Sequence, residues 1–306
     1  ESLHPNSAPG LGFLLGEQPD ASILDNFAAN GWITTDTLLN QQLTQQYTSR
    51  LNIRSTIEPI NKFRIQITAQ RSETQNSSQL YRNMGNEEMP DFQSLNKNVT
   101  GSFNMSFLAI GTAFRPMNLN SSETFDELRF MRTEIANRVA QQNGVAVNSS
   151  QEYPVGFGPN SQEVLIPSFM AAYSGTSASS QTLNKFPKVP MPNWNIKFDG
   201  LIGVPWIKKR FKTFSISHGY SSTYSINSYQ TNLFYNPNEA FTGTPENNPE
   251  NFDVNGDYIS QYQIQTVSIS EQFSPLIKLD LTMNNSLTTR FEISKDRQVS
   301  LSLSNN

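Results

Sequence analysis

The 306-residue sequence contains no cysteine, which excludes disulfide bonds, cysteine nucleophiles and cysteine-ligated zinc. Charged residues make up only 16% of the chain, whereas about a quarter is usual in a soluble domain. The net charge of −4 argues against nucleic-acid binding, because the basic run Lys208–Arg210 is too short to form a patch with interleaved aromatic residues. No apolar run approaches 18 residues, so a transmembrane helix is excluded.

Side chains that could carry chemistry are also scarce. Neither of the two histidines, His4 and His218, can be assigned a nucleophile and an orienting acid. The segment Asp253–Asp257 resembles a calcium loop, but its glycine comes too early and Ile264 stands where a bidentate acid is required. We therefore predict a polar turn there. The glycines of residues 10–16 have the wrong spacing for a phosphate loop, which favours a flexible apolar segment. We predict that the chain is not an enzyme and has no catalytic residue, metal site or cofactor.

The stretch 211–227 is the clearest structural signal. Five apolar or aromatic residues fall on even positions and five small polar ones on odd positions, as in a β-strand with one apolar and one polar face. The first set is Phe214, Ile216, Tyr220, Tyr224 and Ile226, and the second is Ser215, Ser217, Ser221, Thr223 and Ser225. The pattern is roughly three times as long as a usual strand of about 5–6 residues. Crossing the hydrocarbon of a membrane takes a tilted strand only about 9–11 residues. We interpret the stretch as a membrane-spanning barrel strand that continues beyond the bilayer, with His218 in an interfacial girdle.

The same alternation recurs along the chain. It predicts strands at 51–57, 63–69, 99–109, 194–198, 277–283, 287–293 and 299–303, and a weaker strand at 165–173. Turns are expected at Pro59–Asn61, 284–286 and 295–298, a bulge at Gln265–Thr266, and loops at 74–97 and 230–257. The predicted fold class is all-β: a segment of a very large antiparallel transmembrane β-barrel, with about ten strands here, one amphipathic helix and long loops.

In such a barrel the apolar phase faces lipid and the polar phase faces the lumen. The predicted lipid-facing residues are Phe63, Ile65, Ile67, Phe103, Met105, Phe107, Phe214, Ile216, Tyr220, Tyr224, Ile277, Leu279, Leu281, Met283, Phe291 and Leu301. The predicted lumen-facing residues are Arg54, Arg64, Gln66, Lys278, Asp280, Arg290 and Glu292.

One segment changes to helical periodicity. Thr124 and Glu127 have capping-box spacing, apolar residues follow at helical intervals, and Gly144 suits a helix end, so we predict a helix at about 123–142. It is too polar to span lipid and is expected in the lumen or in the aqueous phase. The predicted organisation is a non-strand lead-in at 1–48, barrel strands at 49–114, a helical insertion and loop at 115–162, and barrel strands with long loops at 163–306.

Six segments together resemble one protein family. They are Leu51–Pro59 with the preceding Gly31-Trp32, Ser102–Phe114, Val164–Gly175, Phe186–Gly200, Phe211–Asn232 and Ser270–Leu276. All are similar to the SprA (Sov) family, the outer-membrane translocon of the type IX secretion system of Bacteroidetes. The resemblance implies a single-chain barrel of very many strands in the bacterial outer membrane, with a wide pore and a lateral gate. It also implies secreted cargo proteins, a PorV-like partner barrel and a periplasmic plug protein as partners, besides outer-membrane lipids.

Three interpretations remain open at this stage. The alternating stretch 300–306 leaves an open strand edge, so we expect an internal fragment of a larger translocon. A large outer-membrane receptor or channel barrel for small solutes is the second interpretation, although no plug domain or receptor motif is visible. A soluble cell-surface β-sandwich is the third, and it would place the apolar face of each strand in a core.

Overall fold

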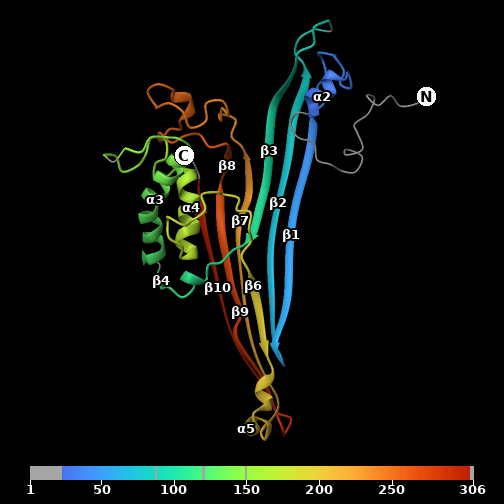
Figure 1. Cartoon of the computed structure of the whole chain (residues 1–306), viewed down its shortest axis with the longest axis vertical. Coiled ribbons are helices and arrows are strands. Elements are labelled where there is room, and N and C mark those ends of the chain that lie inside the picture. The colour runs from blue at the N-terminus through green and yellow to red at the C-terminus, as the bar shows by residue number, and fades with distance from the viewer. Residues whose placement is uncertain (1–22, 87, 119–120, 149, 304–306) are drawn as a thin grey trace, which may run out of the picture. The chain divides into compact units, whose positions relative to one another are not determined.

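The computed structural model describes residues 23–86, 88–118, 121–148 and 150–303. The helices are α2 (Ile23–Ala29), α3 (Glu123–Gln142), α4 (Gln162–Ser174) and α5 (Pro205–Lys208), with short 3-10 turns η1 (Ile110–Thr112), η2 (Gly200–Gly203) and η3 (Pro249–Asn251) (Figure 1). The strands are β1 (Leu43–Ile60), β2 (Phe63–Asn83), β3 (Phe92–Ser106), β4 (Met117–Asn118), β5 (Ser121–Ser122), β6 (Asn193–Phe198), β7 (Phe211–Thr231), β8 (Tyr262–Ile264), β9 (Thr266–Met283) and β10 (Thr288–Ser302). The predicted glycine-rich segment 10–16 lies outside the described residues.

Strands dominate the fold, as predicted: they hold 45% of the described residues, and helices hold 19%. In the part of the chain that the structure describes, eight strands form one sheet in the order β1-β2-β3-β7-β9-β10, with β6 paired to β2 and β7, and β8 paired to β7. The strands β3, β6, β8 and β9 all run antiparallel to β7, and β10 runs antiparallel to β9. The long central strand predicted at 211–227 is confirmed and has 21 residues.

Two predicted non-strand regions are in fact largely strand. The strand β1 begins at Leu43, inside the lead-in predicted at 1–48, which also contains α2. The polar stretch 74–97, predicted as a loop, belongs mostly to β2 and β3. Polar residues occupy both phases of this stretch, so period-two hydrophobicity could not reveal the strands.

The C-terminal hairpin also differs from the prediction. The turn at 284–286 is present, but the turn predicted at 295–298 is not, because β10 runs through it with a register shift between Ile293 and Lys295. Charged residues there resemble a turn in sequence, whereas in the structure Arg297 serves an ion pair described below. The bulge predicted at Gln265–Thr266 is a break between β8 and β9.

The helix predicted at 123–142 is confirmed as α3, although its N-cap is Ser122, which accepts a hydrogen bond from the Phe125 amide. The strand predicted at 165–173 is wrong, because this stretch forms the helix α4. Eight of the residues from Val164 to Ala172 are buried, so the helix is apolar around its circumference and carries no amphipathic period. The region 163–306 thus begins with a second long helix.

The helices α3 and α4 belong to a segment inserted between β3 and β6, two strands that share one position in the sheet. The strand β3 pairs with β7 through Thr100–Ser106, and β6 pairs with the same strand through Trp194–Phe198. Both strands also neighbour β2. The chain therefore leaves the position between β2 and β7 after Ser106, forms α3 and α4, and returns to that position at Asn193 (Figure 1). We call residues 107–192 the insertion.

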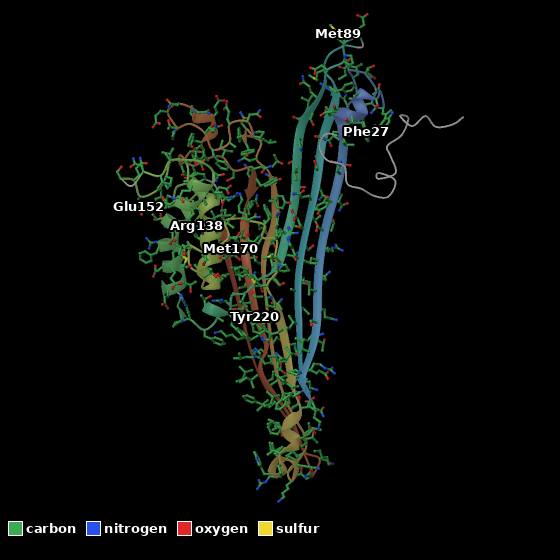
Figure 2. All side chains as sticks on the ribbon, in the orientation of Figure 1. Phe27, Met89, Arg138, Glu152, Met170 and Tyr220 are labelled. Atoms are coloured by element: carbon green, nitrogen blue, oxygen red, sulfur yellow. The ribbon has the colours of Figure 1, made fainter. Side chains whose placement is uncertain are left out.

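The chain divides into two compact units, Glu1–Tyr47 with Gln75–Val99, and Thr48–Thr74 with Thr100–Asn306. In the first unit, the Tyr81 hydroxyl donates to Asp25 (2.7 Å) and its ring stacks on Phe92. The second unit contains the insertion and the strands that carry all the predicted facing residues. Figure 2 marks its layers with Arg138 on α3, Met170 on α4 and Tyr220 on β7.

Among the described residues, no helix is long and apolar enough to cross a membrane.

Candidate functional site

One end of the second unit's sheet carries an apolar surface. Residues directly opposite each other on antiparallel strands project from the same face. In one row of this face, Phe198 lies opposite Ile216, Ile216 opposite Leu279, and Leu279 opposite Phe291. The face is continued by neighbouring rows, and we call the set the apolar band: Phe63, Ile65, Ile67, Ile196, Phe198, Phe214, Ile216, Ile277, Leu279, Leu281, Phe291 and Ile293.

Much of the apolar band is open to solvent. The side chains of Ile277, Phe291 and Ile293 are 47%, 51% and 44% exposed, and the other members are half-buried. Of the remaining predicted lipid-facing residues, Met283 lies opposite Phe211 at the end of the band, and Leu301 lies opposite Val267, beyond it. Contiguous exposed apolar surfaces of this kind are typical of membrane, protein or ligand interaction sites.

Aromatic residues lie at the end of the apolar band that is nearer to the insertion. Trp194 stacks on Tyr220 (4.5 Å between ring centroids), and Phe273 lies 5.0 Å from the same ring. His218 lies 6.5 Å from Trp194, and its Nδ1 is 2.7 Å from the Leu276 carbonyl. From Phe273 to Met283 there are eleven residues, which matches the about 9–11 residues of a tilted membrane-spanning strand.

The opposite face of the same strands is polar. Arg290 lies opposite Asp280 with Nε 2.7 Å from Oδ1, and Glu292 lies opposite Lys278. The Lys278 ammonium is 3.7 Å from Asp280 and 3.8 Å from Glu292, so the four charges form one alternating lattice. The predicted lumen-facing residues Arg54 and Gln66 line a polar recess with Gln70 and Gln272, and Arg64 pairs with Glu58 at 2.8 Å.

Five of the residues predicted to face lipid are enclosed by the chain itself: Phe103, Met105, Phe107, Tyr220 and Tyr224 are at most 7% exposed. Four of them are on β3 and β7, which the insertion covers, and Phe107 is the first residue of the insertion. Phe186 of the insertion packs edge-to-face on Phe103, and the Tyr224 hydroxyl donates to the Lys185 carbonyl. Alternation placed these residues on one face of the sheet, but it could not reveal that helices cover part of that face.

Side-chain hydrogen bonds replace backbone pairing at the point where the insertion interrupts the sheet between β3 and β6. The hydroxyl of Ser106, fully buried, accepts from the Gln70 amide (2.8 Å) and donates to the Gln70 carbonyl (3.1 Å). On the other side, the Ser222 amide donates to Asn193 Oδ1, and the Ser222 carbonyl accepts from the Phe107 amide. These contacts satisfy backbone groups that a continuous strand would have paired.

A buried ion pair fastens the insertion to the sheet. Arg297 on β10 lies opposite Glu271 on β9, with Nη2 2.8 Å from Oε2. Their side chains are 11% and 2% exposed, so neither charge is well hydrated. Glu271 also accepts a hydrogen bond from the Tyr220 hydroxyl, which in turn accepts from the Ala109 amide. Buried charges need such partners, because an unpaired one carries a large desolvation penalty.

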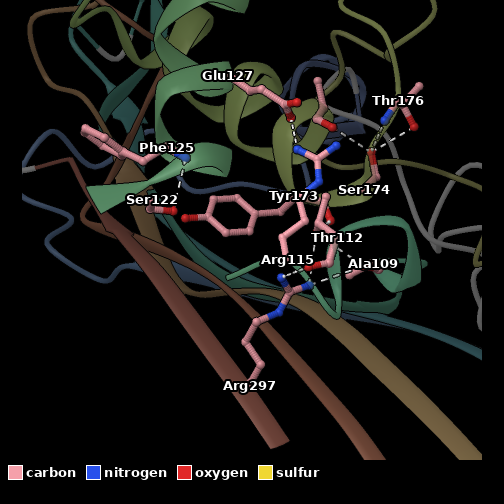
Figure 3. A network of polar contacts seen from close by, with 11 residues as sticks. Ala109, Thr112, Arg115, Ser122, Phe125, Glu127, Tyr173, Ser174, Thr176 and Arg297 are labelled. Carbon is pink, nitrogen blue, oxygen red and sulfur yellow. Dashed lines mark hydrogen bonds and ion pairs between the residues drawn. The ribbon is translucent and has the colours of Figure 1, made fainter. Parts of the chain in front are cut away.

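The guanidinium of Arg297 also caps the turn η1. It donates to the Thr112 carbonyl (2.8 Å), the Thr112 hydroxyl (3.1 Å) and the Ala109 carbonyl (3.2 Å) (Figure 3). Thr112 links η1 to α4, because its hydroxyl donates a hydrogen bond to the Tyr173 carbonyl at 2.7 Å. A Cβ atom on Gly111 would stand 2.8 Å from the Ser174 carbonyl, so only glycine permits this close approach. We call Ala109, Thr112, Tyr220, Glu271 and Arg297 the clamp.

Sequence reasoning did not predict the clamp. Its residues come from Ser102–Phe114, Phe211–Asn232 and Ser270–Leu276, three of the segments that carry the family resemblance, and it reaches a fourth at Tyr173. Arg297 lies outside them, in the predicted turn. The available signal was a charge on the apolar phase of a strand, at positions 271 and 297, where only a buried partner makes a charge tolerable.

The long loop between β7 and β8 contains a buried carboxylate. Asp257, 5% exposed, accepts a 2.6 Å hydrogen bond from the Gly158 amide of the insertion. Burial raises the pKa of the Asp257 carboxyl to about 6; the Gly158 hydrogen bond lowers it, and the nearby Asp253 raises it further. Asp253 accepts from the amides of Asn255 and Asp257, as in the predicted polar turn. Among the described residues, no cluster of three acids or histidines could hold a metal ion.

No family model matches the chain, and no significant match was found among curated proteins.

Proposed function

We propose that this chain is a wall segment of a large outer-membrane β-barrel that exports folded proteins, and that it contributes no chemistry of its own. The observation that carries the proposal is the exposed apolar band, backed by a lattice of charges on the opposite face of the same strands. A barrel wall requires this arrangement, because one face contacts lipid and the other contacts water.

The ends of the strands support an orientation. The connections at 61–62, 199–210 and 284–287 lie at one end of the sheet, because Phe63 pairs with Phe198 and Phe211 pairs with Met283. The loop 232–261 and the insertion lie toward the other end. In outer-membrane barrels the short turns face the periplasm and the long loops face outward. We place the insertion outside the cell, on the outer side of the wall beyond the aromatic residues, which puts α3 in the aqueous phase rather than in the lumen.

The proposal requires further strands. The strands β1 and β10 are the edges of the described sheet, and an open edge is not stable in hydrocarbon. Barrel diameter grows roughly linearly with the number of strands, and about 16–18 strands already enclose an aqueous channel. A wider barrel lined with Ser, Thr, Gln and alternating charges suits the passage of a large hydrated cargo better than the recognition of a small ligand.

The assignment to protein export rests on the resemblance of the six segments to the type IX translocon family. A soluble β-sandwich is disfavoured, since it would bury the apolar band against a second sheet, whereas Ile277, Phe291 and Ile293 are about half exposed. A receptor barrel for small solutes shares the same wall and differs in what it transports.

The deciding experiment is deletion of the parent gene in a gliding or protease-secreting bacterium, followed by analysis of the culture medium. We expect secreted proteins to disappear from the medium and to return when the intact gene is restored. Undiminished secretion with loss of uptake of one small nutrient would support the receptor and contradict export.

A further inference from the structure

The turn between β6 and β7 carries a dense group of cations at the end of the apolar band. It contains Lys208, Lys209, Arg210 and Trp206, and Lys212 follows at the start of β7; the four cations are exposed, and Trp206 is 64% exposed. We call these five residues the basic turn. Its charge is too short a run for nucleic acid, and neither the barrel wall nor protein export requires it.

The backbone of the basic turn is held in place by the neighbouring hairpin. The Asn284 amide donates to the Arg210 carbonyl (3.0 Å), and Asn284 Nδ2 donates to the Lys209 carbonyl (2.8 Å). In the short helix α5, Ile207 is buried, with only 4% exposed. The carbonyls of Lys209 and Arg210 are therefore hydrogen-bonded within the protein, while the charged side chains of these residues are exposed.

The cations of the basic turn have no acidic partner in the part of the chain that the structure describes. The carboxylate nearest to them in sequence, Asp199, is paired with Lys197 at 3.2 Å. Lys212 donates to the neutral Ser286 hydroxyl. Four positive charges on the short segment 208–212 repel one another, so their spacing favours an anionic partner that supplies several negative charges at once.

The location of the basic turn identifies that partner. Phe211, between Arg210 and Lys212, makes edge-to-face contact with Phe214, which belongs to the apolar band. An exposed tryptophan beside lysines and arginines, at the margin of an apolar surface, is the pattern of a membrane interface, where the ring lies among headgroups and the cations reach phosphates. We propose that the basic turn is an interfacial anchor that binds the headgroups of anionic phospholipids. This inference rests on the proposed barrel wall.

The test uses tryptophan fluorescence in lipid nanodiscs. The measurement is made on the complete barrel, with Trp32, Trp194 and any tryptophan outside this segment replaced by Phe. The fluorescence then comes from Trp206, and brominated lipid quenches it on contact. We expect brominated phosphatidylglycerol to quench Trp206 more strongly than brominated phosphatidylcholine at the same mole fraction. The variant K208Q/K209Q/R210Q should lose at least about fivefold of this lipid preference, since each cation near a charged membrane contributes a factor of about five.

Two controls make the result specific. The variant R50Q/K97Q/K188Q removes the same charge from exposed residues elsewhere and should keep the preference. In the unaltered basic turn, raising the salt from about 0.1 M to about 1 M shortens the screening length from about 10 Å to about 3 Å and should weaken the preference, a measurement that needs no charge substitution.

A tryptophan at position 281 separates the two proposals. In a background without other tryptophans, L281W should be quenched by both brominated lipids. If L281W is quenched but Trp206 shows no preference for phosphatidylglycerol, or if both triple variants behave alike, the anchor is refuted and the wall stands. If neither position is quenched by either lipid, the barrel wall is refuted, and the anchor with it.

Discussion

Breaking the clamp should release the insertion from the sheet, and Glu271→Gln is the sharpest way to break it. Gln retains an oxygen that can accept from the Tyr220 hydroxyl but removes the charge that Arg297 requires. Removing one partner of a buried ion pair costs about 3–5 kcal/mol. Because Arg297 keeps three acceptors on Ala109 and Thr112, we expect about 3 kcal/mol, which is roughly a hundredfold in the opening equilibrium.

Hydrogen exchange followed by mass spectrometry measures this opening locally. The Ala109 amide donates to the Tyr220 hydroxyl, so peptides that contain residues 109–113 should exchange about a hundredfold faster in E271Q. The matched control is Glu58→Gln, which removes an ion pair with Arg64 whose side chains are 53% and 66% exposed, and which should cost less than about 1 kcal/mol.

A double variant tests whether charge is the cause. In E271M/R297M both charges are replaced by apolar side chains, and the freed carbonyls of Ala109 and Thr112 keep backbone donors from Thr112 and Arg115. We expect slower exchange in the double variant than in E271Q, as for other buried ion pairs. If E271Q exchanges no faster than E58Q, the clamp does not hold the insertion and the reasoning is refuted.

Three further predictions concern the wall, the junction and the loop. An arginine at Leu281 should destabilise the membrane-inserted chain by about 2–4 kcal/mol, whereas one at Thr282 should be tolerated; equal effects in denaturant titrations in lipid would contradict the facing assignment. Ser106→Ala should cost about 1–3 kcal/mol by leaving the Gln70 amide without its acceptor, and an unchanged melting temperature would count against this bridge. The pKa of Asp257, about 6, lies above its value of about 3.9 in an unfolded chain, so its stabilising contribution is complete below about pH 4 and is lost as the pH rises through 6. Asp257→Asn should therefore flatten the dependence of the melting temperature on pH between about 4 and 7, and an unaltered slope would refute a buried, titrating carboxyl.

Strict alternation made part of this fold predictable from sequence. Where apolar and polar residues alternate, as in 211–227 and 277–283, the sequence predicted the strand and which residues share a face, because successive side chains on a strand point to opposite faces. The helix α3 followed from its helical period and from the glycine at 144, which adopts a positive φ of 73°.

The remaining features are set by tertiary packing. The helix α4 is buried on every side, so its sequence has no polar stripe by which to tell a helix from a strand. Polar residues in 74–97 occupy both strand phases, which leaves no pattern to detect. Arg297 resembles a turn residue until Glu271 is seen beside it, and Tyr220 resembles a lipid-facing residue until the insertion covers it. Each depends on a contact between segments far apart in the chain.

The most direct test of the barrel wall is a spin-label scan of residues 277–283 with the protein in lipid. Labels at 277, 279, 281 and 283 should collide preferentially with oxygen dissolved in the bilayer, and labels at 278, 280 and 282 with a water-soluble nickel chelate, because successive side chains point to opposite faces. Equal access to both reagents along the strand, or oxygen contact on the even positions, would contradict the account.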